Sequence, residues 1–144
     1  MLKKSAAALA ALVLVFEVMA AVGSHRSRLT GCQTLGSPCN ISLNDHDLQK
    51  FVLIAAQAFN NQTNDAFLFR PAAILSAQRQ IVKGLHYIVE LELARTVCPK
   101  RAHKNLKQCD FQPAGALSQT LRCHADIWWI PWTHRLQTQI HCPT

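Results

Sequence analysis

Residues 80–93 read QIVKGLHYIVELEL, and this stretch decides the fold of the chain. Apolar side chains stand at positions 85, 87, 89, 91 and 93, whereas polar ones stand at 86, 90 and 92. Such alternation is typical of an antiparallel strand with one buried face. Residues 72–77 also have strand character, and Gly84 supplies the positive φ that a tight hairpin requires. The stretch therefore predicts two antiparallel strands joined at a hairpin tip, Gln80–Gly84.

The composition of this tip is unusual for a turn. Its residues are Gln80, Ile81, Val82, Lys83 and Gly84, so two branched apolar side chains stand where polar residues are the norm. Loops often carry binding residues, and exposed apolar groups mark contact surfaces. We therefore interpret the tip as a contact surface rather than as a simple connector.

The rest of the chain supplies one helix and further strands. Apolar residues recur at spacings of three and four from Asp45 to Phe59, which predicts an amphipathic helix, and the turn-rich run at 60–65 is expected to end it. Strand character resumes at 117–130, stops at Pro131-Trp132 and returns at 136–142. These elements predict an α+β domain in which one amphipathic helix packs on a four- or five-stranded antiparallel sheet.

The first 23 residues have the features of a secretory signal peptide. Two early lysines precede an apolar run from Ala6 to Met19, and small residues follow it. We expect cleavage after Gly23, or as second choice after Ala20, which leaves a single domain at 24–144. The apolar run is short for a membrane span, and no later stretch is long and uncharged enough, so we expect no transmembrane segment.

The chain is basic, with 15 Lys and Arg against 8 Asp and Glu. Lys100, Arg101, Lys104 and Lys107 gather in one stretch, Lys100–Lys107. One interpretation is a patch for an anionic glycan or membrane surface, and the other is an ordinary solvated loop. Nucleic acid is not an expected partner, because the chain lacks the interleaving of aromatic and basic residues that stacks bases.

All six cysteines follow residue 23, and an even number in a secreted chain indicates disulfides. Nearest-neighbour pairing is favoured for four of them, Cys98 with Cys109 and Cys123 with Cys142, because each pair closes a local loop. A zinc site is the alternative, but no C-x-x-C and no His pair at ligand spacing supports it. We expect neither a metal nor a cofactor.

Other sequence signals concern modification and catalysis. Asn40 and Asn61 each begin an N-glycosylation tripeptide, and Asn61, expected in a polar loop, is favoured. Paired cysteines leave no evident nucleophile, and no glycine-rich phosphate loop or clustered carboxylate pair is present. The sequence therefore does not predict an enzyme.

Three segments together resemble the type 2 cystatins, secreted inhibitors of papain-like cysteine proteases. They are the Q-x-V-x-G pattern at 80–84, the Pro131-Trp132 pair, and Leu35-Gly36 followed by Pro38, and four cysteines have a similar spacing. The resemblance spans nearly the whole chain after the signal peptide. It implies the cystatin fold for the α+β domain.

In this family the three segments form one wedge that fills the protease cleft. The resemblance implies that Leu35 occupies an apolar subsite and that Gly36 turns the chain away from the catalytic centre. It also implies that Gln80–Gly84 lies over the catalytic cysteine, while Trp132, next to Pro131, anchors the opposite side. Each residue also has an ordinary structural interpretation, such as a core-edge aromatic for Trp132. The implied activity is reversible, competitive inhibition of cathepsins, outside cells or in endosomes and lysosomes.

The sequence also points to two other functions. Asn64 and Asp65 match the loop through which some type 2 cystatins are thought to inhibit legumain, an unrelated protease, and the alternative is an ordinary polar turn. The runner-up to protease inhibition is a basic binding or antimicrobial protein that keeps the fold and acts through Lys100–Lys107.

Cys39 departs from the family pattern, because it is an extra cysteine seven residues after Cys32, and the two straddle Gly36. An even set of secreted cysteines tends to leave no free thiol, so we hypothesise a Cys32–Cys39 bridge that stiffens the N-terminal segment. The sequence leaves open whether these cysteines pair within one chain or between chains, and with it the oligomeric state.

Overall fold

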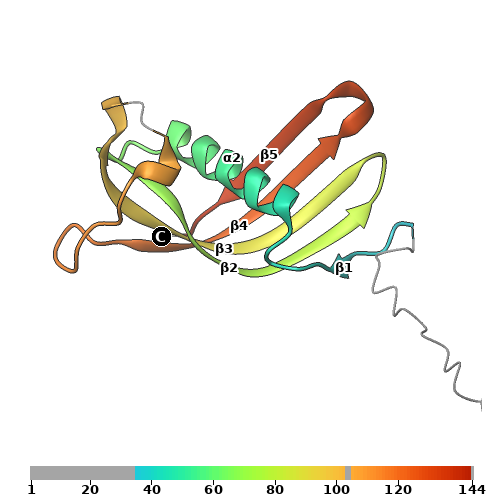
Figure 1. Ribbon diagram of the computed structural model, residues 1–144, viewed down its shortest axis with the longest axis horizontal. Coiled ribbons are helices and arrows are strands. Elements are labelled where there is room, and N and C mark those ends of the chain that lie inside the picture. The colour runs from blue at the N-terminus through green and yellow to red at the C-terminus, as the bar shows by residue number, and fades with distance from the viewer. Residues whose placement is uncertain (1–34, 103–104, 144) are drawn as a thin grey trace, which may run out of the picture. The chain divides into compact units, whose positions relative to one another are not determined.

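A computed structural model describes residues 35–102 and 105–143 (Figure 1). The predicted signal peptide at 1–23 and Cys32 lie outside these residues, so both remain predictions. No helix within the described ranges is long and apolar enough to span a membrane.

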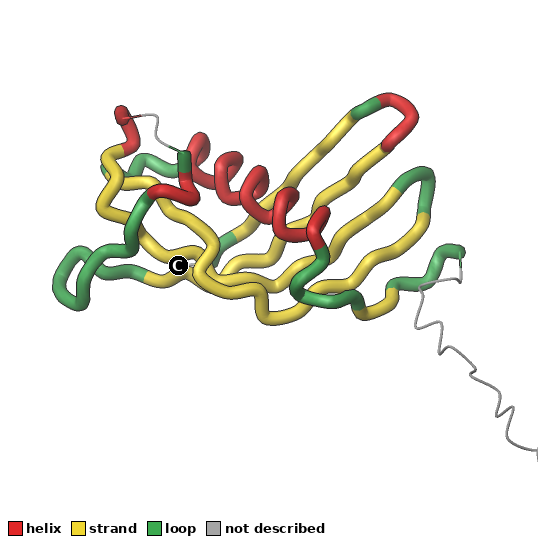
Figure 2. Tube along the Cα trace, in the orientation of Figure 1, coloured by secondary structure: helices red, strands yellow, loops and turns green. Residues whose placement is uncertain are grey.

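A five-stranded antiparallel sheet forms the body of the described chain, and its strand order follows the sequence. The strands are β1 (Cys39–Asn40), β2 (Phe67–Ile81), β3 (Leu85–Pro99), β4 (Thr120–Ile130) and β5 (Arg135–His141). One helix, α2 (His46–Gln62), lies across one face of this sheet (Figure 2). The predicted fold, one helix on a four- or five-stranded antiparallel sheet, is confirmed.

The alternation in the deciding stretch places its odd-numbered side chains from position 87 onward in the core. Tyr87, Val89, Leu91 and Leu93 are fully buried, and so are Ala125 and Ile127, which face the same side from β4. Helix α2 closes this layer with Leu48, Phe51, Val52, Ala55 and Ala56. The Phe51 and Tyr87 rings meet edge to face, with centroids 5.3 Å apart. The core therefore follows from a period of two on β3 and a period near 3.6 on α2.

Helix α2 begins directly after Asp45, as the sequence predicts, and extends to Gln62, three residues beyond the predicted end at Phe59. Asp45 caps it, because the carboxylate accepts a hydrogen bond from the Leu48 N–H at 2.9 Å. The run at 60–65 ends the helix, as predicted, but it does so at Gln62, so the first three residues of the run are helical. Asn60 is buried, and its amide donates to the Phe69 carbonyl and accepts from the Phe69 N–H, both at 2.8 Å. This pairing with β2 extends the helix through Gln62, so Asn61 is exposed in the last helical turn and not in a loop.

The first hairpin tip is also shorter than predicted. Ile81 pairs with Leu85, so Gln80 and Ile81 belong to β2 and the turn is Val82–Gly84. Ile81 is half-buried, which corrects the expectation that it is exposed, whereas the Val82 side chain is exposed. Pro71 lies at a register shift in β2, as a proline in a strand requires.

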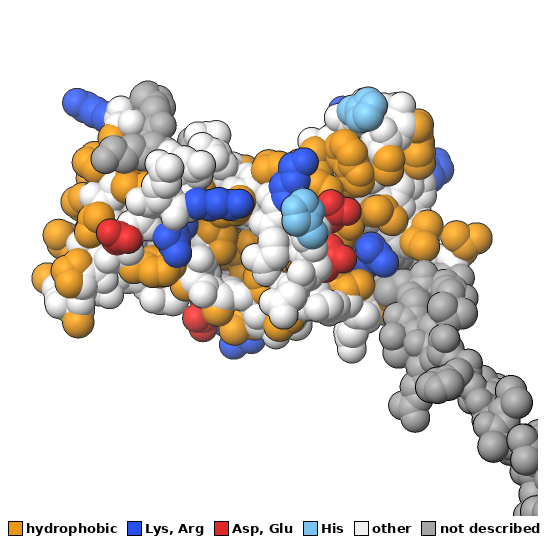
Figure 3. Space-filling view, in the orientation of Figure 1, with side chains coloured by type: hydrophobic (Ala, Val, Ile, Leu, Met, Phe, Trp, Pro, Cys, Tyr) orange, Lys and Arg blue, Asp and Glu red, His pale blue; other side chains and the backbone are white. Residues whose placement is uncertain are grey.

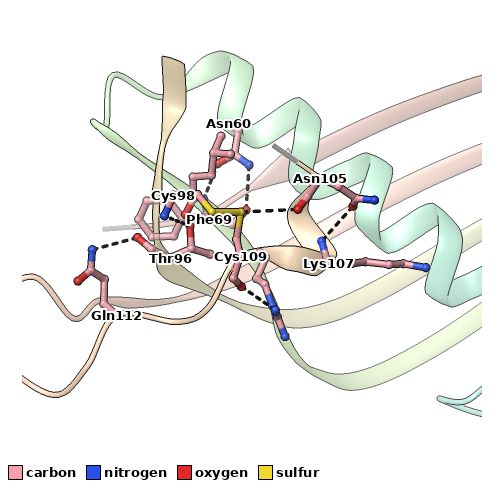
Figure 4. Close-up of a disulfide and its surroundings, with 10 residues drawn as sticks. Asn60, Phe69, Thr96, Cys98, Asn105, Lys107, Cys109 and Gln112 are labelled. Carbon is pink, nitrogen blue, oxygen red and sulfur yellow. Dashed lines mark hydrogen bonds between the residues drawn. A yellow bond between two sulfur atoms is a disulfide. The ribbon is translucent and has the colours of Figure 1, made fainter. Parts of the chain in front are cut away.

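Two disulfides have the predicted pairing, Cys98–Cys109 and Cys123–Cys142. The first joins the end of β3 to Cys109, the residue that follows a short 3₁₀ helix, η3 (Leu106–Gln108), within an irregular segment (Figure 4). The second joins β4 to the residue that follows β5. Cys39 is disulfide-bonded, but the hypothesis that it pairs with Cys32 involves a residue outside the described part and stays a prediction.

Histidine and carboxylate side chains form a chain of contacts across β3 and β4. His124 Nδ1 lies 2.5 Å from Glu90 Oε1, and Asp126 contacts His124 Nε2 at 3.2 Å and His86 Nε2 at 2.7 Å. The hydrogen bond to Glu90 raises the pKa of His124 against the smaller opposing effect of burial, and the Asp126 charge adds to this rise. Protonated His124 therefore stabilises the folded state.

Replacing His124 by glutamine is expected to change the pH dependence of stability. Because the folded-state pKa lies above the ordinary 6.5, the contribution is fully present below that pH and is lost as the pH rises through the folded-state pKa. The difference in Tm between wild type and His124→Gln should be larger at about pH 5.5 than at about pH 8.5. Thermal denaturation at both pH values measures it, and a constant difference would contradict the prediction.

Candidate functional site

Three chain segments lie at the same end of the sheet, where both long hairpins turn (Figure 1). They are the N-terminal residues Leu35-Gly36, the β2–β3 turn region Gln80–Gly84, and Pro131-Trp132 between β4 and β5. We call these residues together the hairpin edge. Sequence reasoning selected all of them, and the structure brings them together although up to about a hundred residues separate them.

The N-terminal segment is attached to the first hairpin by two hydrogen bonds. The Gly36 N–H donates to the Ile81 carbonyl at 3.2 Å, and the Gln80 side-chain amide donates to the Gly36 carbonyl at 2.6 Å. Gly36 has φ of +86°, a conformation that favours glycine. Gln80 therefore positions the segment that carries Leu35.

Gly84 joins the two hairpins. Its φ is +118°, and a Cβ at this position would lie 2.6 Å from the Trp129 carbonyl oxygen of β4. The sequence predicts the positive φ but not this close approach, which comes from the β3–β4 pairing of Leu85 with Trp129. Any side chain at Gly84 would displace backbone, so substitutions there test folding as well as binding.

Trp132 differs from the other two tryptophans in its exposure. Trp128 stacks on His86 with ring centroids 4.3 Å apart, and Trp129 lies against Phe51 at 5.8 Å. Trp132 sits in a single 3₁₀ turn, η4 (Pro131–Thr133), and 69% of its surface is exposed. A tryptophan that the fold leaves uncovered is available for a partner.

Each segment of the hairpin edge presents one exposed apolar side chain. Leu35 is 77% exposed and Val82 46% exposed, in addition to Trp132. Lys83 is the one ionisable residue of the hairpin edge, and the described residues contain no group of side chains that could hold a metal ion. Three exposed apolar side chains at one end of the sheet are suited to contact with a partner.

Comparison with known proteins now identifies the family. The model of the cystatin domain matches residues 36–132, about two thirds of the chain. The chain belongs to the cystatin family. Members of this family are protein inhibitors of cysteine proteases and not enzymes.

Individual relatives extend the match. Human cystatin-F is 41% identical over 105 residues, which cover 73% of this chain and 72% of that protein. Cystatin from Gallus gallus is 34% identical over 128 residues, which cover 89% of this chain and 86% of that protein. Among solved structures, the crystal structure of dimeric human cystatin F matches with a TM-score of 0.70 and 36% identity, covering 84% of this chain and 98% of that one.

The second candidate loop of this cystatin, Asn64-Asp65, lies at the opposite end of the sheet, after α2 (Figure 1). Asn64 is exposed, but Asp65 forms a two-pronged ion pair with Arg95, at 2.5 Å to Nη2 and 3.2 Å to Nε. Burial alone would raise the pKa of Asp65, yet the hydrogen bonds from Arg95 and from the Phe67 N–H lower it. Asp65 thus fixes the loop to Arg95 of β3, and Asn64 is the exposed side chain of this residue pair.

Proposed function

We propose that this cystatin is a reversible, competitive inhibitor of papain-like cysteine proteases, the cathepsin class, and that it binds through the hairpin edge. The observation that carries the proposal is the set of exposed apolar side chains, Leu35, Val82 and Trp132, on three segments at one end of the sheet. Family membership supports the activity, and this geometry supports the binding surface.

The edge suits tight binding because it is already ordered. Hydrogen bonds hold Gly36 against β2, and the packing of Gly84 on Trp129 fixes the two hairpins relative to each other. A surface ordered before binding loses little conformational freedom in the complex. The proposal places the tip over the protease's catalytic cysteine, with Leu35 and Trp132 in apolar contacts on either side.

Titration of papain or cathepsin L with the purified protein tests this proposal. Competitive, fully reversible inhibition is the expected result. Absence of inhibition at micromolar concentration, together with retained binding to anionic surfaces, would instead favour the basic binding or antimicrobial protein that uses Lys100–Lys107.

Replacing Gln80 by alanine is expected to weaken inhibition about fivefold, the effect of losing roughly one hydrogen bond. The reason is loss of the bond to the Gly36 carbonyl, which positions the N-terminal segment. Inhibition constants measure the effect. In a variant that lacks the N-terminal segment up to and including Gly36, replacing Gln80 by alanine should have almost no further effect on the inhibition constant. Additive losses in the two variants would show that Gln80 does not act through this segment.

We propose that the Asn64 loop inhibits legumain, independently of the hairpin edge. The Arg95–Asp65 pair supports this because it orders the loop around an exposed Asn64. Asn64→Lys should abolish legumain inhibition and leave papain inhibition within about twofold, because the loop and the edge lie at opposite ends of the sheet. Inhibition constants for both proteases test this, and unchanged legumain inhibition would contradict it.

We also propose that the protein is secreted and glycosylated, with endosomes or lysosomes as a second destination. Both candidate asparagines, Asn40 and Asn61, are exposed, as glycan attachment requires.

A further inference from the structure

A basic hollow of about 400 Å³ lies between α2, β2 and η3, and it shares no residue with the hairpin edge. Lys50 comes from α2, Arg70 from β2 and Lys107 from η3, so three elements each contribute one cation. No carboxylate is among the residues that line it, which are His46, Gln49, Lys50, Val52, Leu53, Arg70, Pro71 and Lys107. Figure 3 shows several basic side chains, and fewer acidic ones, on one face of the molecule.

Arg70 is held in place at this hollow. Its Nη1 donates to the Cys109 carbonyl at 2.7 Å, and the guanidinium lies 4.2 Å from the centroid of the Phe111 ring. Among the described residues, Nε and Nη2 of Arg70 have no protein acceptor. A fixed guanidinium with free donors is a suitable group for a planar or tetrahedral oxyanion.

Lys107 approaches from a segment that is also anchored. Its backbone N–H donates to the Asn105 side chain at 3.1 Å, and the Cys98–Cys109 disulfide fixes the end of η3 (Figure 4). The Lys107 and Lys50 side chains are exposed. Two mobile ammonium groups therefore flank a fixed guanidinium.

Among the described residues, none of these three cations forms an ion pair with a carboxylate. The ion pairs there involve other groups, and the acidic residue that contacts a lining residue is Asp47, 3.8 Å from His46. The formal net charge of the whole chain is +7. An anionic ligand is therefore attracted to the chain as a whole and does not have to displace an ion-pair partner from Lys50, Arg70 or Lys107.

We propose that this hollow binds sulfate groups of an acidic polysaccharide. A ligand with several anionic groups fits better than a single free anion, because the cations come from three elements and surround a space several times larger than one sulfate. The basic stretch Lys100–Lys107 does not act as one patch here. Lys100 and Arg101 line a different hollow beside Asn64, and Lys107 alone of the described cations in that stretch faces this one.

The test compares two double variants that remove the same number of charges. Lys50→Ser with Lys107→Ser removes two cations from the hollow, and Arg122→Ser with Arg135→Ser removes two exposed cations elsewhere. Arg70 stays, because its bond to Cys109 also supports the fold. Binding of a heparin oligosaccharide should weaken about tenfold in the first variant and less than about twofold in the second. Both should keep the wild-type Tm and inhibition constant toward papain.

Three further arms identify the ligand. A desulfated oligosaccharide should not bind. Inorganic phosphate should displace the heparin oligosaccharide only at far higher concentration than the oligosaccharide itself. Binding of the protein to anionic phospholipid vesicles should not depend on Lys50 and Lys107. Equal losses in the two double variants would show that net charge alone drives binding and would overturn the site. Displacement by phosphate at similar concentration, or vesicle binding that needs the two lysines, would overturn the polysaccharide assignment.

Discussion

Replacing Trp132 by alanine is expected to raise the inhibition constant toward papain-like proteases by about 30-fold or more, equivalent to about 2 kcal/mol. The indole is 69% exposed on η4, so the folded protein gains little from it, whereas a complex would bury its large apolar surface. The Tm should therefore stay close to that of the wild type. Inhibition constants for papain and cathepsin L, with a thermal melt of the same sample, measure both effects.

Leu117→Ala is the matched control for this prediction. Leu117 is 53% exposed and lies before β4, at the end of the sheet away from the hairpin edge (Figure 1). Its removal also deletes exposed apolar surface but should leave inhibition unchanged. If Trp132→Ala inhibits like wild type, or if Leu117→Ala weakens inhibition as much, the hairpin edge is not the binding surface.

Replacing Asn60 by leucine is expected to lower the free energy of unfolding by roughly 2 to 5 kcal/mol, because it leaves two buried backbone groups without partners. The Asn60 amide now satisfies both the N–H and the carbonyl of Phe69, and a leucine of similar size can satisfy neither. The Tm should fall by about 10 °C or more. Thermal or denaturant unfolding of the variant measures this loss.

The neighbouring substitution Asn61→Leu controls for helix propensity and composition. Asn61 belongs to the same last turn of α2 but is exposed, so its replacement should change stability by no more than about 0.5 kcal/mol. Bacterial expression keeps glycans out of the comparison. Equal stability of wild type and Asn60→Leu would mean that the pairing with Phe69 does not hold the helix to β2.

The sequence predicts those parts of the molecule that depend on local pattern. Alternation on β3 fixes which side chains face the core, and the spacing on α2 fixes the face that covers them. The hairpin at 80–84 and the stop at Pro131 follow from the backbone preferences of glycine and proline. The residues of the hairpin edge came from a family resemblance, since nothing local distinguishes Leu35 from a residue of a disordered tail.

Local pattern failed where a distant partner changes the outcome. The Asn60–Asn61 run has low helix propensity, yet α2 continues because Asn60 finds its hydrogen bonds on β2. Gly84 is a turn glycine by sequence, but its contact with Trp129 depends on how β3 pairs with β4. Likewise, the charges of Lys50, Arg70 and Lys107 are far apart in sequence and form one hollow only after α2 packs on the sheet.

The sequence by itself therefore determined the fold class, the two disulfide pairings found in the described residues, and the residue types that one end of the sheet presents. Tertiary structure decided that Gln80 holds Gly36 and that Trp132 is exposed while Trp128 and Trp129 are covered. The physical reason is the distance along the chain over which each kind of interaction acts. Backbone preferences and periodicity act over a few neighbouring residues, whereas hydrogen bonding and exposure depend on which distant segments fill the same space.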